Sequence, residues 1–184
     1  MNPNAGLKDS AVLEKSIRDV PDFPKKGIIF KDITTLLKDG NMFRLAIDKI
    51  VNKFKSRHID AVISVEARGF ILGSAVAYKL RAGLVPVRKK GKLPSVTHSV
   101  TYQLEYGSDT LEIHRDAFKK GANILIVDDL LATGGTVRAV IDLVEKMGGK
   151  VAGVAFLIEL VSLDGQKKLK GYPVYSIIEN KYTK

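Results

Sequence analysis

The chain has 184 residues, a formal net charge of +10 and no cysteine. It can therefore build one domain with a sizeable core, and it has no disulfide or thiolate chemistry. No stretch reaches the roughly 20 apolar residues of a membrane span, and the polar N-terminus does not read as a signal peptide. We expect a single domain over residues 1–184, in a reducing cytoplasm and without a membrane partner. The positive charge suits a solvated basic face, nucleic-acid binding or a highly phosphorylated substrate, and composition does not separate these.

The first part of the chain predicts an irregular segment followed by a helix. Residues 17–38 contain Pro21, Pro24 and Gly27, which interrupt regular structure and indicate a flap. Apolar residues then recur over residues 43–54 at the spacing that places them on one face of a helix.

The rest of the chain mostly alternates strands and helices. Short apolar runs rich in β-branched residues predict buried strands at residues 61–65, 84–87, 124–127, 151–157 and 174–178. A helix at residues 70–80 is apolar almost all round, so we expect it to be well buried. A second helix, at residues 136–147, ends at a pair of glycines. Strands separated by helices indicate βαβ units and a doubly wound α/β fold.

Two segments break this alternation. Residues 88–99 are rich in Lys, Gly, Pro and Ser, which predicts a mobile loop. Residues 99–115 alternate apolar and polar side chains in the manner of an antiparallel hairpin, and the sequence Gly107-Ser108-Asp109 predicts its turn.

The stretch ILIVDDLLATGGT, residues 124–136, carries the most specific chemistry. Its small-residue loop opens a helix, where free N–H groups and the helix dipole favour a phosphate. The adjacent carboxylates Asp128 and Asp129 then need another partner, such as sugar hydroxyls, a bound Mg²⁺ or a developing positive charge. A ligand that offers phosphate at one end and a cis-diol with a cationic transition state at the other is a phosphoribosyl group.

The same stretch strongly resembles the diphosphate-binding signature of type I phosphoribosyltransferases. Three further stretches resemble the adenine phosphoribosyltransferase family in the same order along the chain. DFPKKGIIFKDIT at residues 22–34 is similar to its base-binding hood, and VEARGF at residues 65–70 to its pyrophosphate loop. VRKKGKLP at residues 87–94, followed by YQLEYG at residues 102–107, is similar to its flexible catalytic loop. The resemblance runs from about residue 10 to the C-terminus.

The resemblance implies a type I phosphoribosyltransferase fold: a mainly parallel twisted sheet flanked by helices, with a small hood and a flexible β-hairpin loop. The hood would come largely from residues 17–38, with contributions from the C-terminal part. The implied reaction joins adenine to 5-phosphoribosyl 1-diphosphate (PRPP), giving AMP and pyrophosphate in purine salvage. Mg²⁺ would be held mainly through PRPP, without a dedicated set of protein ligands. The implied enzyme is a cytoplasmic homodimer that binds no nucleic acid.

The resemblance also implies roles at the sugar and the lid. Asp128 and Asp129 would hold the ribose hydroxyls and stabilise ribosyl cation character. Glu105 would handle the proton on the imidazole side of adenine, and Tyr106 would help close the site. The 5′-phosphate would lie in the loop formed by Ala132, Thr133, Gly134, Gly135 and Thr136.

Pyrophosphate and base have their own implied residues. Pyrophosphate would be bound by Glu66, Ala67 and Arg68, where a non-proline cis peptide at Glu66–Ala67 would aim the backbone, and by Arg88, Lys89 and Lys92 from this subunit or a neighbouring one. Phe30 would stack on adenine, while Ile29 and Lys31 would supply backbone contacts to its edge. Lys31 departs from the family, in which arginine is common at this position.

Simpler interpretations remain open at this point. Arg68 could be a helix-end cation, Glu105 a solvated hairpin residue, and Phe30 a core residue, while the histidines have no metal-ligand spacing. An enzyme for another purine, such as hypoxanthine or xanthine, is one alternative function. A PRPP-sensing regulator would need a DNA-binding domain, and residues 1–40 contain no helix-turn-helix pattern. A basic nucleic-acid module would bind with a steep dependence on salt.

Overall fold

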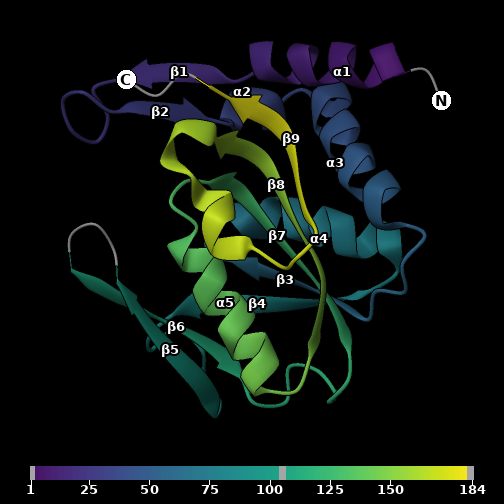
Figure 1. The fold of residues 1–184 in the computed structure, drawn as a ribbon, viewed down its shortest axis with the longest axis vertical. Helices are drawn as coiled ribbons and strands as arrows, with labels where there is room; N and C mark the ends of the chain where they lie inside the picture. Colours follow the sequence, from purple (N-terminus) through teal and green to yellow (C-terminus); the bar gives the residue numbers. More distant parts are fainter. Residues whose placement is uncertain (1–2, 104–106, 182–184) are drawn as a thin grey trace.

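Figure 1 shows the fold in a computed structural model, which describes residues 3–103 and 107–181. Its main sheet has the strand order β5-β6-β4-β3-β7-β8-β9. The strands of that sheet are β3 (Ala61–Val65), β4 (Gly83–Lys89), β5 (Thr97–Gln103), β6 (Ser108–His114), β7 (Asn123–Leu131), β8 (Lys150–Leu160) and β9 (Val174–Asn180). A separate two-stranded sheet contains β1 (Arg18–Pro21) and β2 (Ile29–Asp32).

The centre of the main sheet is parallel and covered on both faces. β3 pairs in parallel with β4 and β7, and β8 pairs in parallel with β7 and β9. All five residues of β3 are buried, because helices cover both of its faces. The parallel arrangement brings the carboxyl ends of β3, β7, β8 and β9 to one edge, where open α/β sheets bind their ligands.

Helices form a layer on each face of this sheet. One layer contains α2 (Thr34–Leu37), α3 (Gly40–Phe54) and α4 (Arg68–Leu80), whose apolar side chains join one core cluster. The other face is covered by α5 (Gly135–Lys146), which belongs to a second cluster and lies in front of the sheet in Figure 1. Asp39 caps the N-terminus of α3, because its side chain accepts hydrogen bonds from the backbone N–H groups of Asn41 and Met42.

The segment 17–38, which we call the hood segment, lies across the carboxyl ends of the strands (Figure 1). It is more regular than its prolines suggest, because β1 and β2 form an antiparallel pair. The first helix, α1 (Pro3–Lys15), was not evident from the sequence and packs against α3 and β9. The Asn180 side chain of β9 donates a hydrogen bond to Glu14 of α1, which ties the two ends of the described chain together.

Most predicted elements are confirmed, and a few boundaries are wrong. The hairpin turn lies earlier than predicted, because Ser108 and Asp109 already pair with Gln103 and Tyr102 in β6 and β5. Both ends of the predicted loop 88–99 belong to strands instead. Two 3-10 helices, η1 (Val161–Leu163) and η2 (Gly165–Leu169), have no counterpart in the prediction.

The predicted burial of the helix at residues 70–80 is partly wrong. One side of α4 carries the buried residues Leu72, Val76 and Ala77. Its other side exposes Ile71 by 42% and Tyr78 by 86%. The apolar character that suggested a fully buried helix therefore belongs in part to an exposed surface.

Candidate active site

A cavity of about 390 Å³ opens at the carboxyl ends of β3 and β7. It collects residues from several of the sequence motifs, because these motifs follow neighbouring parallel strands. Its lining residues are Val65, Glu66, Ala67, Arg68, Lys89, Tyr102, Asp109, Leu111, Asp128, Asp129 and Thr136. The cavity thus presents both carboxylates and cations to one volume, as a phosphorylated sugar requires.

The two carboxylates belong to β7, which continues past them to Leu131 instead of ending before them. Asp128 Oδ1 accepts a hydrogen bond of 2.9 Å from the backbone N–H of Asp129. The carboxylate of Asp128 can reach the start of α4 because Gly69 has no side chain: a Cβ there would lie 2.6 Å from Asp128 Oδ1. Gly69 is therefore required for close packing at the site.

Burial raises the pKa of both carboxylates. The pKa of Asp128 lies well above its usual range because burial and the neighbouring charge of Asp129 both disfavour ionisation. Burial also raises the pKa of Asp129, and the nearby Arg68 guanidinium opposes this shift. A group that brings positive charge into the cavity favours the ionised pair, so the site is prepared for a cationic partner.

The loop after β7 has the geometry that a phosphate needs. Gly134, at φ +75°, is the residue before α5 and adopts the left-handed conformation that glycine tolerates best. The first helical residues, Gly135 and Thr136, therefore present unpaired N–H groups at the positive end of the α5 dipole. Thr136 lies at the cavity wall, where its hydroxyl is 3.4 Å from the hydroxyl of Tyr102.

The peptide between Glu66 and Ala67 is cis, as the family resemblance implies. The Glu66 carboxylate is not available to line an anion site, because it is hydrogen-bonded to Arg88 and Lys89 at the end of β4. Its Oε2 accepts hydrogen bonds of 3.0 and 2.8 Å from Arg88, and its Oε1 accepts one of 2.6 Å from the Lys89 N–H. Burial raises the pKa of Glu66, but these hydrogen bonds and the charge of Arg88 outweigh it and lower the pKa overall. The backbone of Glu66 is therefore the part of the residue that is available to bind an anion.

The other basic candidates differ in how they face the cavity. The ammonium group of Lys89 lies at its wall and pairs with Asp109 at 3.0 Å, which raises the pKa of Lys89 and lowers that of Asp109. Arg88 donates to the backbone oxygen of Lys92 at 3.0 Å in addition to Glu66. Among the described lining residues, Lys89 and Arg68 supply the cations, and Arg88 and Lys92 are not part of this lining.

Arg68 joins the cavity to the hood segment. Its guanidinium forms an ion pair of 2.6 Å with Asp129, without the alignment of a hydrogen bond. It also donates a hydrogen bond of 3.2 Å to the backbone oxygen of Lys31 and lies 4.8 Å from the centroid of the Phe30 ring. Because Arg68 is the first residue of α4, where the helix dipole disfavours a cation, it is not a helix-stabilising charge.

Comparison with known proteins agrees with this geometry. The chain matches the model of the phosphoribosyl transferase domain over residues 32–182. It is 60% identical to an adenine phosphoribosyltransferase of Trichlorobacter lovleyi over 167 residues, which cover 91% of this chain and 98% of the relative. The chain belongs to the adenine phosphoribosyltransferase family.

Solved structures of the family have the same fold. The enzyme of Thermoanaerobacter pseudethanolicus superposes with a TM-score of 0.90 at 51% identity, covering 93% of this chain and 99% of that one. The enzyme of Saccharomyces cerevisiae, solved with adenine and an imino-altritol bisphosphate, gives a TM-score of 0.88 at 36% identity, covering 94% and 99% of the two chains. The fold is therefore that of a type I phosphoribosyltransferase.

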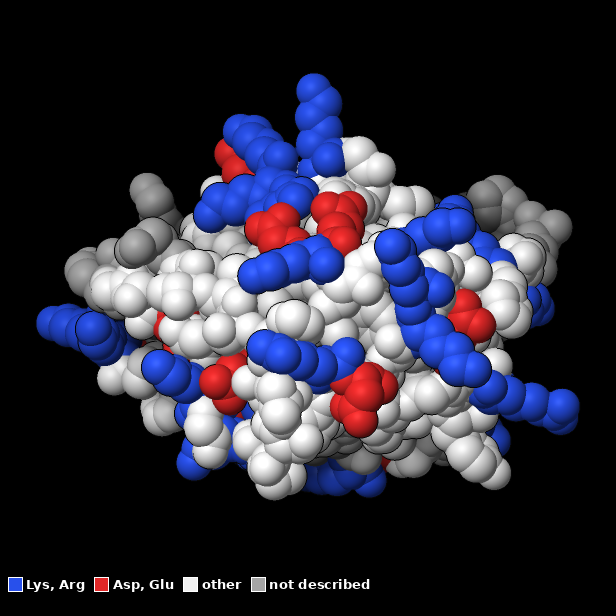
Figure 2. Space-filling model, turned by 90° about the horizontal axis from the view of Figure 1, so that it is seen from below, with Lys and Arg blue, Asp and Glu red and all other residues white. Residues whose placement is uncertain are grey.

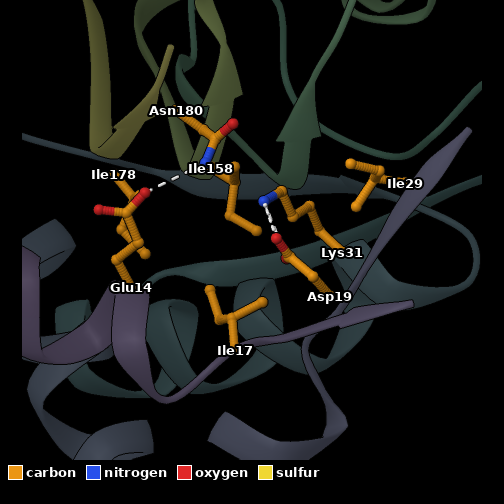
Figure 3. A pocket seen from close by; sticks show the side chains of 8 residues that line it. All are labelled: Glu14, Ile17, Asp19, Ile29, Lys31, Ile158, Ile178 and Asn180. Carbon is orange, nitrogen blue, oxygen red and sulfur yellow. Dashed lines mark hydrogen bonds and ion pairs between the residues drawn. The ribbon is translucent and has the colours of Figure 1, made fainter. Parts of the chain in front are cut away.

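Family membership gives meaning to the two faces of β2. Phe30 points to the Arg68 side, where it also meets Phe23 edge-on at 5.1 Å between ring centroids. Ile29 and Lys31 point into a second cavity of about 320 Å³ on the opposite side, which Figure 3 shows. There the Lys31 ammonium pairs with Asp19 at 2.8 Å. The backbone of Lys31 thus faces the site while its side chain does not, so lysine can stand where the family often has arginine.

Two predicted site residues lie outside the described part of the chain, and two residues that line the cavity were not predicted. Glu105 and Tyr106 lie outside the described residues. Tyr102, which has no predicted role, lines the cavity beside Thr136, and Asp109, predicted in the hairpin turn, pairs with Lys89 there. Only the alternation of the hairpin could have indicated them, because it places residues 102 and 109 opposite one another.

The positive charge outside the cavity is dispersed over the surface at the lower end of the molecule (Figure 2). Figure 2 shows the lower end of the molecule, where lysine and arginine side chains stand among acidic ones without forming one continuous patch. This distribution favours the solvated basic face over a nucleic-acid surface there. No helix among residues 3–103 and 107–181 is long and apolar enough to cross a membrane.

Proposed function

We propose that this chain transfers the 5-phosphoribosyl group of PRPP to adenine and releases AMP and pyrophosphate, a reaction of purine salvage. The observation that carries the proposal is the union of Asp128 and Asp129, the Gly134–Thr136 helix start and Arg68 around one cavity. The homology to enzymes of this name supports it along nearly the whole chain. We also propose the cytoplasm as its compartment, which suits a chain without cysteine.

At the sugar, the two carboxylates would act on the charge that the reaction develops. Displacement at the anomeric carbon builds positive charge on the ribose ring, so preorganised carboxylates stabilise the transition state more than the ground state. We assign the ribose hydroxyls to Asp128 and Asp129. We assign the 5′-phosphate to the loop that ends in Gly134, Gly135 and Thr136, whose N–H groups lie at a helix start.

At the leaving group, cations would neutralise the departing pyrophosphate. We assign this role to Arg68, Lys89 and the backbone of Glu66 and Ala67. Mg²⁺ would be held here mainly through PRPP, since it is usually bound by one or two carboxylates together with substrate phosphates, and Asp128 and Asp129 line the cavity. When bound, it would supply charge that favours the leaving diphosphate.

At the base, the hood segment would read adenine through its backbone. The Lys31 backbone oxygen lies on the Arg68 side of β2, where it accepts a hydrogen bond from Arg68, and Phe30 presents a ring next to it. We assign stacking to Phe30 and edge recognition to the backbone of Ile29 and Lys31. Glu105, from the family motif, is proposed to handle the proton of the attacking imidazole nitrogen.

A homodimer is part of the proposal. The exposed side of α4 carries Ile71 and the aromatic Tyr78, which lie seven residues apart and therefore on one face of the helix. Apolar side chains of this size gathered on one helix face are typical of an interface between subunits. A second copy of the chain is the partner that fits a symmetric enzyme of this size.

Product analysis tests the function directly. The purified protein is incubated with adenine, PRPP and Mg²⁺, and AMP and pyrophosphate are quantified by chromatography and ³¹P NMR. Equimolar formation of both products is the expected result. Parallel reactions with hypoxanthine, xanthine and guanine test the other purines, and turnover of one of these in place of adenine would overturn the assignment of the base.

A further inference from the structure

We propose that Glu159 is a positioning residue for the 5′-phosphate loop and that it acts through Gln166 and Gly165. This inference rests on the proposed function, because it takes the loop from Ala132 to Thr136 as the 5′-phosphate site. It adds a second layer of residues behind that loop, drawn from the end of β8 and from η2.

The anchor is a buried carboxylate with partners on two other elements. Glu159 is 4% exposed and lies near the end of β8, in register with Leu131 of β7. Its Oε2 accepts a hydrogen bond of 2.7 Å from Gln166 Nε2 in η2 and another of 2.7 Å from Ser176 Oγ in β9. A carboxylate is costly to bury unless hydrogen bonds compensate it, so this arrangement fixes the side chains that supply the donors.

The neighbour of Gln166 is wedged against the phosphate loop. A Cβ on Gly165 would lie 2.2 Å from the backbone oxygen of Ala132 and 2.9 Å from Leu131 Cδ1. A Cβ on Gly134 would in turn lie 2.5 Å from the backbone oxygen of Gly165. Two glycines therefore allow the backbones of η2 and the phosphate loop to interlock, and neither side can shift without the other.

The consequence is a rigid support behind an anion site. A phosphate loop must hold its N–H groups in fixed directions, since a displacement of about 1 Å in a positioned group can cost about 10²-fold in rate. Glu159 holds Gln166, Gln166 adjoins Gly165, and Gly165 limits the position of Ala132 and Gly134. Glu159 and Gly165 are both buried, and the link between them is the hydrogen bond of Gln166, which is itself an exposed residue.

Three variants test this chain of contacts, with ribose 5-phosphate as the probe of the loop and adenine as the probe of the hood. Gln166→Met removes one donor to Glu159, and Ser176→Ala is the matched control, because it removes the other donor to the same oxygen at the same distance. Gly165→Ala inserts a methyl group into the interlock. Calorimetry gives the Kd of each ligand, thermal unfolding gives the Tm, and kinetics separate KM for PRPP from kcat.

We expect Gly165→Ala to weaken ribose 5-phosphate binding by at least about tenfold and Gln166→Met by several-fold, with adenine affinity unchanged. KM for PRPP rises more than kcat falls in both. Ser176→Ala lowers the Tm about as much as Gln166→Met but keeps wild-type ribose 5-phosphate affinity. A purely structural Glu159 would instead make the two donor variants alike in every measurement, which overturns the proposal.

A fourth variant, Thr136→Val, separates this inference from the function beneath it. If Thr136→Val weakens ribose 5-phosphate binding while Gln166→Met and Gly165→Ala do not, the support role of Glu159 is wrong and the loop assignment stands. If none of the variants changes ribose 5-phosphate binding, the loop itself is wrongly assigned and both conclusions fail. Gln166→Met decides the question alone should Gly165→Ala not fold.

Discussion

The guanidinium of Arg68 lies 4.8 Å from the centroid of the Phe30 ring and donates to the backbone oxygen next to it, that of Lys31. Arg68 thus contacts both the ring face and the carbonyl that we assign to adenine. The same side chain pairs with Asp129 in the cavity, where the pyrophosphate is expected. A diphosphate that attracts Arg68 therefore also frees the place of the base.

The first prediction follows from this competition. Arg68→Ala should bind adenine about twofold to fivefold more tightly than the wild type in the absence of PRPP, since a cation–π contact of about 0.5–1 kcal/mol no longer has to be broken. Its kcat should nevertheless fall, because the leaving pyrophosphate loses a cation. Calorimetric titration with adenine measures the first effect, and Arg68→Lys is the control. Weaker adenine binding by Arg68→Ala would contradict the competition.

The second prediction concerns catalysis by the acidic pair. Asp128→Asn and Asp129→Asn should each lower kcat by about 10²–10³, because a neutral amide cannot stabilise developing ribosyl charge. The rate is measured with PRPP saturating, so that weaker binding does not disguise itself as slower chemistry. Unchanged kcat in both variants would remove the carboxylates from the mechanism.

The same substitution at Asp128 should stabilise the free protein. The folded pKa of Asp128 is raised above the ordinary value, so its contribution to stability is present at low pH and is lost as the pH rises through the folded pKa. At pH 7, Asp128→Asn should therefore have a higher Tm than the wild type, and the difference should shrink toward pH 4. Thermal unfolding across this range checks the sign, and a lower Tm for the variant at pH 7 would show that the charge is not strained.

The third prediction concerns the choice of purine. Adenine presents a donor at N6 beside an acceptor at N1, which the backbone C=O and N–H of one residue can pair, whereas hypoxanthine presents the reverse. Sites that hydrogen-bond a substrate group reject analogues that lack it by roughly 10⁴–10⁵, so we expect kcat/KM for adenine to exceed that for hypoxanthine and guanine by at least about 10³. Stacking on Phe30 serves all purines about equally.

Two substitutions at one position test whether backbone does this reading. Lys31→Ala should keep most of the selectivity, because the Lys31 side chain lies in the second cavity with Asp19. Lys31→Pro should reduce it by removing the N–H. Competition assays with paired purines measure the ratio, and a large loss in Lys31→Ala would assign the reading to the side chain.

The fourth prediction concerns the hood segment in acid. The pKa of Asp32 is lowered to about 2 by its hydrogen bonds with Thr34 and Arg18. A lowered folded pKa contributes stability above the ordinary value near 3.8 that is lost as the pH falls toward 2. Asp32→Asn should therefore lower the Tm at pH 7, and its difference from the wild type should vanish between pH 4 and 2. An Asp32→Asn difference that is independent of pH would rule out the carboxylate as the cause.

The fifth prediction concerns the exposed side of α4. If this surface joins two subunits, Tyr78→Asp should convert the homodimer to a monomer, since a charge cannot be buried unpaired in an apolar interface. Light scattering coupled to gel filtration measures the mass, and Lys79→Asp, one residue further along the helix, is the control for added charge. A wild-type protein of monomer mass would refute the homodimer at once.

Sequence alone gave much of this architecture because its signals are local. Buried parallel strands read as continuous apolar runs, so β3 was predicted to the residue and β7, β8 and β9 over part of their lengths. The family motifs also indicated the cis peptide at Glu66–Ala67, which is confirmed. The extent of β7 was missed, because a strand that continues through two aspartates looks like a strand that ends before them.

What sequence could not supply are relations between distant residues. The pairing of Glu66 with Arg88 joins positions 22 residues apart, and that of Glu159 with Ser176 joins two strands. Neither pair has a periodic or compositional signature. α1 was missed for a related reason, because its sequence is only weakly amphipathic and its packing against α3 and β9 has no local signature.

The Glu66 carboxylate mechanically couples the hairpin of β5 and β6 to the pyrophosphate loop at residues 65–70. It accepts hydrogen bonds from Arg88 and Lys89, where β4 leads toward the hairpin of β5 and β6. Glu66 also forms the cis peptide with Ala67, the residue that precedes Arg68. A displacement of the hairpin is therefore transmitted directly to the pyrophosphate loop at residues 65–70. We therefore expect a change in the position of the hairpin to shift the loop that we assign to pyrophosphate as well.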